Sequence, residues 1–314
     1  MSGKRCEWLG GDERGIARAA ELLREGRLVA MPTETVYGLA ARADRTEAVA
    51  EIYRAKGRPD FNPLIVHVGS RELARSLALF DARADLLAER FWPGPLTLVL
   101  PLRQPSAIAP AVTAGLPTIA LRQPVHPLAA ALLEELNLPL AAPSANRSGS
   151  LSPTRAEHVA ASLGAAPAAI LDGGASARGM ESTIVALRED GSWQLLRPGP
   201  VTEAELSELL GPATPLREAR IEAPGQLARH YSPGKPVRLE ALAAESDEFM
   251  VGLGEIGGDC TMSEAGDLAE AAARLYACLH EAAASDRPRI AVAPVPEEGI
   301  GAAINDRLRR AAAG

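Results

Sequence analysis

Two cations and an amide crowd into one short turn of this chain. Lys56, Arg58 and Asn62 stand among glycine and proline residues directly before the apolar run 63–68, and His67 lies near the end of that run. Guanidinium and ammonium groups form charge-assisted hydrogen bonds with phosphate oxygens. A rigid turn that holds such groups beside a buried strand therefore favours an anion-binding site.

Similar groups recur in other turns that flank apolar runs. Ligand crevices in α/β sheets form where strands end, so these side chains are candidates for one shared site. The turns carry hydroxyls and cations but very few carboxylates, which favours an anionic ligand such as a nucleotide. The candidates are Thr33, Thr35, Thr118, Arg122, Ser144, Ser152, Ser182 and Arg197.

Each candidate also has a purely structural explanation. Thr35 can cap a turn, Ser152 can cap a helix, and His67 can be a satisfied core histidine. Lys56 and Arg58 can be a solvated pair at a helix C-terminus, where the helix dipole favours cations. The concentration of these residues, rather than any one of them, points to a binding site.

Other common site types find little support. Residues 252–257 (GLGEIG) match the glycine pattern of dinucleotide sites, but the following GDCTMSEAGD is a poor start for the helix that such a site needs. The chain contains no P-loop, H-E-x-x-H, C-x-x-C or G-x-S-x-G pattern.

Hydrophobic periodicity and turn residues predict the elements that must position these groups. Alternation of strands with helices, and the continuous apolar character of the strands, predict an α/β domain with a covered sheet. We expect helices over 13–25, 45–55, 82–91, 126–136, 154–163 and 202–210, and strands over 28–31, 63–68, 96–100, 118–122, 138–142, 168–171, 182–187 and 193–197.

The chain divides into two domains and a connecting segment. Residues 1–215 form the first domain, the Pro- and Gly-rich stretch 216–236 reads as a linker, and 237–314 form a small second α/β domain. In that domain we expect strands over 237–240, 249–254 and 289–293, and helices over 267–284 and 298–311.

The net charge and the cysteine content limit the possible ligands and the cellular compartment. The net charge of −7 argues against nucleic-acid binding through global charge. Cys6, Cys260 and Cys278 are odd in number and far apart, so we expect free thiols in a reducing compartment. The N-terminus lacks an apolar signal region, and no run is long enough to span a membrane; a cytoplasmic protein is expected.

Several ordered motifs resemble the YrdC family. They cover about residues 12–235, and RHYSP (229–233) followed by a small α/β module is similar to the family's two-domain form. The motifs are PTETVYGL (32–39), KGRPDFNPLIVHV (56–68), WPGPLTLVL (92–100), TAGLPTIALR (113–122), APSANRSGSLSPT (142–154), GMESTIV (179–185) and LLRPGPV (195–201).

The resemblance implies a YrdC-like twisted mixed sheet with flanking helices, plus a small Rossmann-like C-terminal domain. It also implies a reaction in which L-threonine, bicarbonate and ATP give threonylcarbamoyl-AMP and pyrophosphate. Mg²⁺ would be held mainly by ATP, with no protein metal site. Other proteins would use the intermediate to modify tRNA; direct tRNA binding by this chain stays open.

The resemblance also implies a role for each matching residue, while it assigns no catalytic acid or base. The expected threonine-binding residues are Thr35, His67, Arg122, Ala142 and Ser182. The expected ATP-binding residues are Lys56, Arg58, Asn62, Thr118, Ser144, Ser152 and Arg197, with Tyr231 of the linker closing over the site.

The sequence leaves two alternative functions open. One is a carbamoyl-phosphate-using transferase of the same fold group, but such proteins carry extra acylphosphatase and zinc-finger-like segments, and this chain lacks the cysteine pairs for them. The other is an RNA-binding module, against which stand the acidic net charge and the absence of interleaved basic and aromatic residues.

Overall fold

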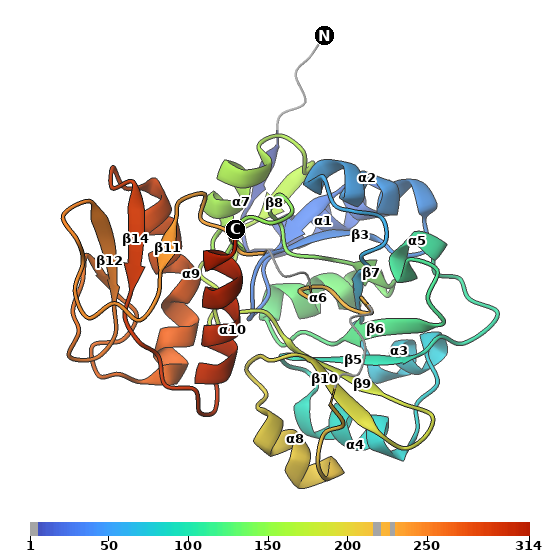
Figure 1. Cartoon of the computed structure of the whole chain (residues 1–314). Coiled ribbons are helices and arrows are strands. Elements are labelled where there is room, and N and C mark those ends of the chain that lie inside the picture. Colours follow the sequence, from blue (N-terminus) through green and yellow to red (C-terminus); the bar gives the residue numbers. More distant parts are fainter. Residues whose placement is uncertain (1–5, 216–220, 227–229) are drawn as a thin grey trace.

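The structure is a computed structural model that describes residues 6–215, 221–226 and 230–314. Two α/β parts lie side by side in it (Figure 1). Of the predicted linker 216–236, residues 216–220 and 227–229 fall outside the described ranges.

A large mixed sheet forms the centre of the first part. It contains both parallel and antiparallel pairs: β4 pairs parallel with β6, whereas β5 pairs antiparallel with β6. The predicted mixed α/β sheet is therefore confirmed. Within the described residues its spatial order is β1 (Glu7–Leu9), β8 (Ala169–Leu171), β2 (Val29–Met31), β3 (Gly38–Arg42), β7 (Leu140–Ala141), β4 (Ile65–His67), β6 (Thr118–Arg122), β5 (Leu96–Pro101), β9 (Thr183–Leu187) and β10 (Trp193–Arg197).

Helices flank this sheet, and several begin where the sequence supplies a cap. Asp12 and Ser70 accept hydrogen bonds from the backbone N–H groups of Gly15 and Leu73. No helix in the described ranges is both long and apolar enough to cross a membrane. The helices are α1 (Glu13–Arg24), α2 (Thr46–Lys56), α3 (Arg71–Leu77), α4 (Ala82–Phe91), α5 (Pro110–Thr113), α6 (Pro127–Leu136), α7 (Ala156–Leu163) and α8 (Glu203–Leu210).

The central strands are buried on both faces, which explains why they read as continuous apolar runs. Leu64 and Val66 point into the main core. Ile65, between them, belongs to a separate small cluster with Val99 and Ala120. Ala223 of the connecting segment joins that cluster, so the segment covers this face of the sheet.

The sequence-based prediction missed the strands β1 and β3. Glu7 and Trp8 of β1 are exposed at the sheet edge and carry no apolar pattern. Residues 38–42 of β3 are mostly small and follow a motif that reads as a turn, but they pair antiparallel with β2. β1 becomes a strand by pairing with the distant β8, and β3 by pairing with the nearby β2 and the distant β7, rather than through local propensity.

The second part contains an all-parallel sheet covered by two helices, as predicted in outline. The short strand β13 (Cys260–Thr261) was not predicted, and residues 253–259 form a turn rather than a helix, so the GLGEIG stretch does not open a dinucleotide site. The remaining elements are β11 (Val237–Arg238), β12 (Glu248–Gly252), β14 (Arg289–Val292), α9 (Leu268–Ala284) and α10 (Gly301–Ala312).

Helices α9 and α10 lie between this small sheet and the first part of the chain (Figure 1). One apolar cluster runs across the boundary, because Leu151 and Met180 of the first part pack with Leu275 and Leu308 of the two helices. The two parts therefore share a core.

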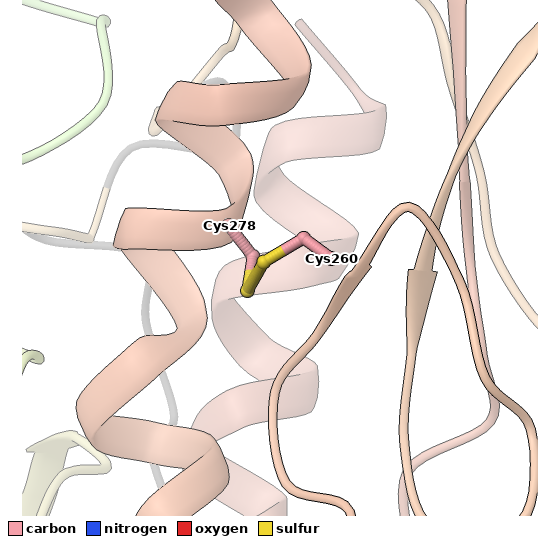
Figure 2. The surroundings of a disulfide bond; sticks show 2 residues. All are labelled: Cys260 and Cys278. Atoms are coloured by element: carbon pink, nitrogen blue, oxygen red, sulfur yellow. A yellow bond between two sulfur atoms is a disulfide. The ribbon is translucent and has the colours of Figure 1, made fainter.

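The expectation of three free thiols was wrong for two of them. Cys260 of β13 and Cys278 of α9 form a disulfide, with their Cα atoms 5.7 Å apart (Figure 2). Cys6 is a free cysteine. Spacing in the sequence carried no signal, because this pairing arises only when α9 packs over β13.

Gly179 tests the contact between the two parts. Its φ is +60°, and an added Cβ would overlap the carbonyl oxygen of Ala273 in α9. Gly191 has a similar φ of +88° with nothing within 4 Å. We expect Gly179→Ala to lose at least about 2 kcal/mol more stability than Gly191→Ala, since only the first adds a clash to the backbone strain. Calorimetric thermal unfolding measures both; equal losses would contradict this packing.

Candidate active site

A small enclosed cavity of about 40 Å³ lies on the sheet face that carries Ile65 and His67. It is thus bounded by a sheet face and the connecting segment, and not only by strand ends as the sequence suggested. Most of the predicted site residues line it: Thr35, Arg58, His67, Arg122, Ala142, Ser144, Ser182, Arg197 and Tyr231.

The other predicted residues lie behind the wall or away from it. Lys56 and Ser152 are buried and contact groups of the cavity wall. Asn62 is buried, and its Oδ1 has no hydrogen-bond partner among the described residues. Thr118 lies at the opposite end of β6 from Arg122 and is partly exposed.

Arg58 at the cavity and Lys56 behind it form one cationic group. Backbone carbonyls accept hydrogen bonds from both side chains. Arg58 donates from Nε to the Asn62 carbonyl at 3.1 Å and from Nη2 to that of Pro63 at 2.9 Å. Lys56 Nζ donates to the carbonyls of Ser144 and Asn146, each at 2.5 Å. Gly57, with φ of +58°, ends α2 and turns the chain between the two cations.

Burial weakens the charged form of these cations. It lowers the pKa of Lys56 well below its usual range, and the neighbouring Arg58 lowers it further. Burial also lowers the pKa of Arg58 to about 10. Among the described residues, no carboxylate accepts a hydrogen bond from either group, so an anionic ligand would stabilise both.

A second group of contacts surrounds Arg122. Its guanidinium pairs with Glu34 at 2.5 Å and donates to Thr35 Oγ1 at 2.7 Å and to the Gly94 carbonyl at 3.2 Å. Thr35 Oγ1 also lies 2.8 Å from Thr33 Oγ1. This network fixes a hydroxyl and a cation side by side at the cavity.

His67 adjoins Arg122 across the sheet, because β4 and β6 pair in register at these residues. Burial, with a smaller contribution from Arg122, lowers the pKa of His67 to about 3, so its imidazole is neutral at physiological pH. Its Nδ1 has no hydrogen-bond partner among the described residues.

Ser182 and Arg197 connect the two groups. Arg197 donates from Nε to the Ser182 carbonyl at 3.0 Å and from Nη2 to its Oγ at 3.1 Å. Ser182 Oγ also hydrogen-bonds Thr97 Oγ1 at 2.7 Å. Burial lowers the pKa of Arg197.

The connecting segment closes the cavity through Gly225, His230 and Tyr231. Tyr231 is fully buried, and a Cβ at Gly225 would lie 2.8 Å from Arg197 Cδ and 3.0 Å from Tyr231 Oη. Only glycine permits this approach. Tyr231 Oη and His230 Nδ1 are buried without hydrogen-bond partners in the described chain.

The site residues that the sequence-based predictions did not include are, among others, Glu34, Glu181, Gly225 and His230. Glu34 and Glu181 stand inside recognised motifs, and His230 precedes Tyr231 in RHYSP. Their motif positions were therefore a usable signal. The contacts that involve them join residues far apart in the sequence. No sequence signal predicted those contacts.

The described residues contain no cluster of three or more His, Cys, Asp or Glu side chains suited to a metal ion. The two carboxylates near the cavity are already engaged, Glu34 by Arg122 and Glu181 by Arg307. This donor set fits Mg²⁺ only as an ion whose ligands are phosphate and water.

The histidines give a pH-dependence of stability. Burial lowers the pKa of His67 and of His230 to about 3, whereas an unfolded histidine titrates near 6.5. The unfolded chain takes up protons first, so stability is complete above about pH 6.5 and falls below it, by about 2 kcal/mol for each such residue at pH 5. Urea unfolding at pH 7.5 and 5.0 measures the loss. His67→Gln should lose less; an equal loss would contradict a neutral buried His67.

Comparison with known proteins places the chain in a family. A family model described as "Telomere recombination" (Sua5_yciO_yrdC) matches residues 21–199, and one described as "Threonylcarbamoyl-AMP synthase, C-terminal domain" matches residues 201–313. The threonylcarbamoyl-AMP synthase of Bacillus subtilis (strain 168) is 42% identical over 328 residues, which cover 95% of this chain and 93% of that protein.

Archaeal relatives give the same result. The threonylcarbamoyl-AMP synthase of Pyrococcus abyssi (strain GE5 / Orsay) is 41% identical over 326 residues, covering 96% of this chain and 94% of that protein. The crystal structure of P. abyssi Sua5 complexed with L-threonine matches with a TM-score of 0.90 at 37% identity, covering 98% of this chain and 97% of that one. The chain belongs to the Sua5/YciO/YrdC family, in its two-domain form.

Proposed function

We propose that this protein is a threonylcarbamoyl-AMP synthase, which converts L-threonine, bicarbonate and ATP into threonylcarbamoyl-AMP and pyrophosphate. One observation carries the proposal. The cations Arg58 and Arg197 line the same cavity as the Arg122–Thr35 network. Relatives that match nearly the whole chain bear this name.

The chemistry needs positioning and charge neutralisation more than side-chain proton transfer. The amine of threonine attacks bicarbonate, and loss of water leaves a carbamate. A carbamate oxygen then attacks the α-phosphorus of ATP, and pyrophosphate leaves. Negative charge concentrates on the phosphates throughout, so buried cations stabilise the transition state strongly in a site from which water is excluded.

Each wall of the cavity has a part in this scheme. Arg58 and Arg197 bind the triphosphate, with Lys56, Asn62, Ser144, Ser152 and Thr118 as the further predicted contacts. Arg122 binds the carboxylate of threonine, beside Thr35, His67, Ala142 and Ser182. Mg²⁺ enters with ATP and supplies further charge neutralisation to the phosphates.

His67 is not the proton acceptor for the threonine ammonium group in this scheme. A pKa of about 3 makes its imidazole a weak base at neutral pH. The unpartnered Nδ1 instead suits a hydrogen bond with the substrate.

The cavity, at about 40 Å³, is smaller than the roughly 300–1,000 Å³ that sites for drug-sized ligands span. In this scheme His230 and Tyr231 therefore move away to admit the nucleotide and return over it. The product would pass to tRNA threonylcarbamoyl-transfer proteins, and we expect the reaction in the cytoplasm, where ATP and tRNA are available.

The direct test is an assay of the pure protein with ATP, Mg²⁺, labelled bicarbonate and L-threonine. We expect pyrophosphate release that depends on threonine, together with a labelled adenylate. The matched control omits threonine. Release that ignores threonine, or no release from protein whose fold is confirmed by circular dichroism, would refute the proposed function.

Arg58 gives a residue-level test. Arg58→Ala should raise the KM for ATP at least about tenfold, since it removes a charge-assisted contact with phosphate worth about 1.5–3 kcal/mol. Arg54→Ala is the matched control, because Arg54 is exposed on α2, the helix that precedes Arg58, and pairs only with Glu51 in the described contacts. Arg58→Lys, which keeps the charge, should fall between them. A folded Arg58→Ala protein with a normal KM for ATP would disprove the phosphate role.

A further inference from the structure

Glu181 is the point at which the second domain reaches the cavity. It lines the cavity, is 5% exposed and directly precedes Ser182. Its Oε1 accepts hydrogen bonds from Ser152 Oγ and Tyr276 Oη, and its Oε2 accepts from Tyr276 Oη at 3.1 Å and from Arg307 Nε at 2.9 Å. Both oxygens are therefore occupied by protein donors.

Two of these donors come from the second domain. Tyr276 belongs to α9 and Arg307 to α10, and both side chains are fully buried. Figure 1 shows these two helices against the first domain. Arg307 also donates from Nη2 to the Pro198 carbonyl at 2.9 Å, beside Arg197. The second domain thus forms hydrogen bonds with two loops of the first domain, and both loops carry site residues.

The second domain holds Ser152 from another direction as well. His280 of α9 lies with Nε2 3.1 Å from the Ser152 carbonyl, and its ring stacks on His158 of α7 at 3.7 Å between centroids. Ser152 is accordingly fixed at its side chain through Glu181 and at its backbone through His280. It does not cap α7, since that helix begins at Ala156 after Arg155.

The charge of Glu181 is maintained by its partners. Burial by itself would raise its pKa, yet Arg307 and Arg197 hold the pKa at about 2. Burial, with Glu181 next, raises the pKa of Tyr276, whose hydroxyl therefore stays protonated as a donor. Glu181 is an anion at physiological pH, between the cation of the second domain and the cation of the ATP side.

We propose that Glu181 is a positioning residue for ATP, and that the second domain sets its orientation through Arg307 and Tyr276. Glu181 orients Ser152. It also fixes the start of β9, where Ser182 accepts a hydrogen bond from Arg197. The second domain thereby completes the nucleotide side of the cavity without touching the nucleotide. This inference rests on the proposed function and adds the role of the second domain to it.

The test compares binding of ATP and of L-threonine by titration calorimetry, with KM and kcat from pyrophosphate release. Glu181→Gln and Arg307→Met should each raise the Kd and KM for ATP at least tenfold and raise the Kd for threonine by a much smaller factor, because Ser182 on the threonine side adjoins Glu181. Because Glu181 and Arg307 act through the same contact, the double variant should bind ATP no more weakly than the weaker-binding of the two single variants. Arg307→Lys, which keeps the charge, should restore part of the affinity.

Two further variants separate positioning from stability. Tyr276→Phe removes one hydroxyl and keeps the ring, so it decides the question if the charge variants do not fold; we expect a three- to tenfold rise in the Kd for ATP. Ile290→Val shortens a fully buried side chain of β14 in the core of the second domain and leaves the partners of Glu181 and Ser152 in place. It should lower the unfolding temperature with an unchanged Kd for ATP.

The contrary outcomes are distinct. Folded Tyr276→Phe protein with wild-type affinity for ATP, equal weakening of ATP and threonine binding, or the same ATP defect in Ile290→Val would overturn the positioning role. A wild-type protein without threonine-dependent pyrophosphate release would instead refute the proposed function. Wild-type turnover together with unchanged variants would refute only the present inference.

Discussion

The burial of several cations in one small space is the constraint on which the rest of the structure depends. Removing an ion from water costs several kcal/mol even after relaxation, and Lys56, Arg58, Arg122 and Arg197 are all buried at or beside the cavity. Backbone carbonyls accept hydrogen bonds from all four side chains but offset only part of their charge, and the carboxylate of Glu34 pairs with Arg122. A polyanionic ligand is the natural complement to such a site, and its binding would relieve an electrostatic strain that the protein otherwise bears.

This constraint also explains why the fold needs so many supporting elements. Carbonyls can be directed at cations only where turns are rigid, which accounts for the glycine and proline residues between α2 and β4. The connecting segment keeps bulk water from the cations. The second domain contributes Arg307, which balances Glu181 and packs 5.4 Å from the centroid of the Tyr231 ring. One buried carboxylate therefore joins three separate parts of the chain.

Much of the fold could be predicted because its signals are local. Capping residues such as Asp12 and Ser70 and the apolar runs placed most helices and strands within a few residues. Edge strand β1 and strand β3 could not be predicted, because pairing with β8 for the first, and with β2 and β7 for the second, creates them rather than a local apolar pattern. Motifs brought the site residues to attention, but the Arg122–Glu34 and Arg307–Glu181 pairs depend on packing. The Cys260–Cys278 disulfide was mispredicted for the same reason.

The position of β8 has a consequence for the order in which the chain can fold during synthesis. This strand lies between β1 and β2 and pairs with both, so residues 7–9 must wait for residues 169–171. The N-terminal edge of the sheet cannot be completed while the first half of the chain leaves the ribosome. Such non-local pairing slows folding and leaves strand edges exposed in the nascent chain. The β2–β3 hairpin, whose strands are close in sequence, is the part of that edge that can form early.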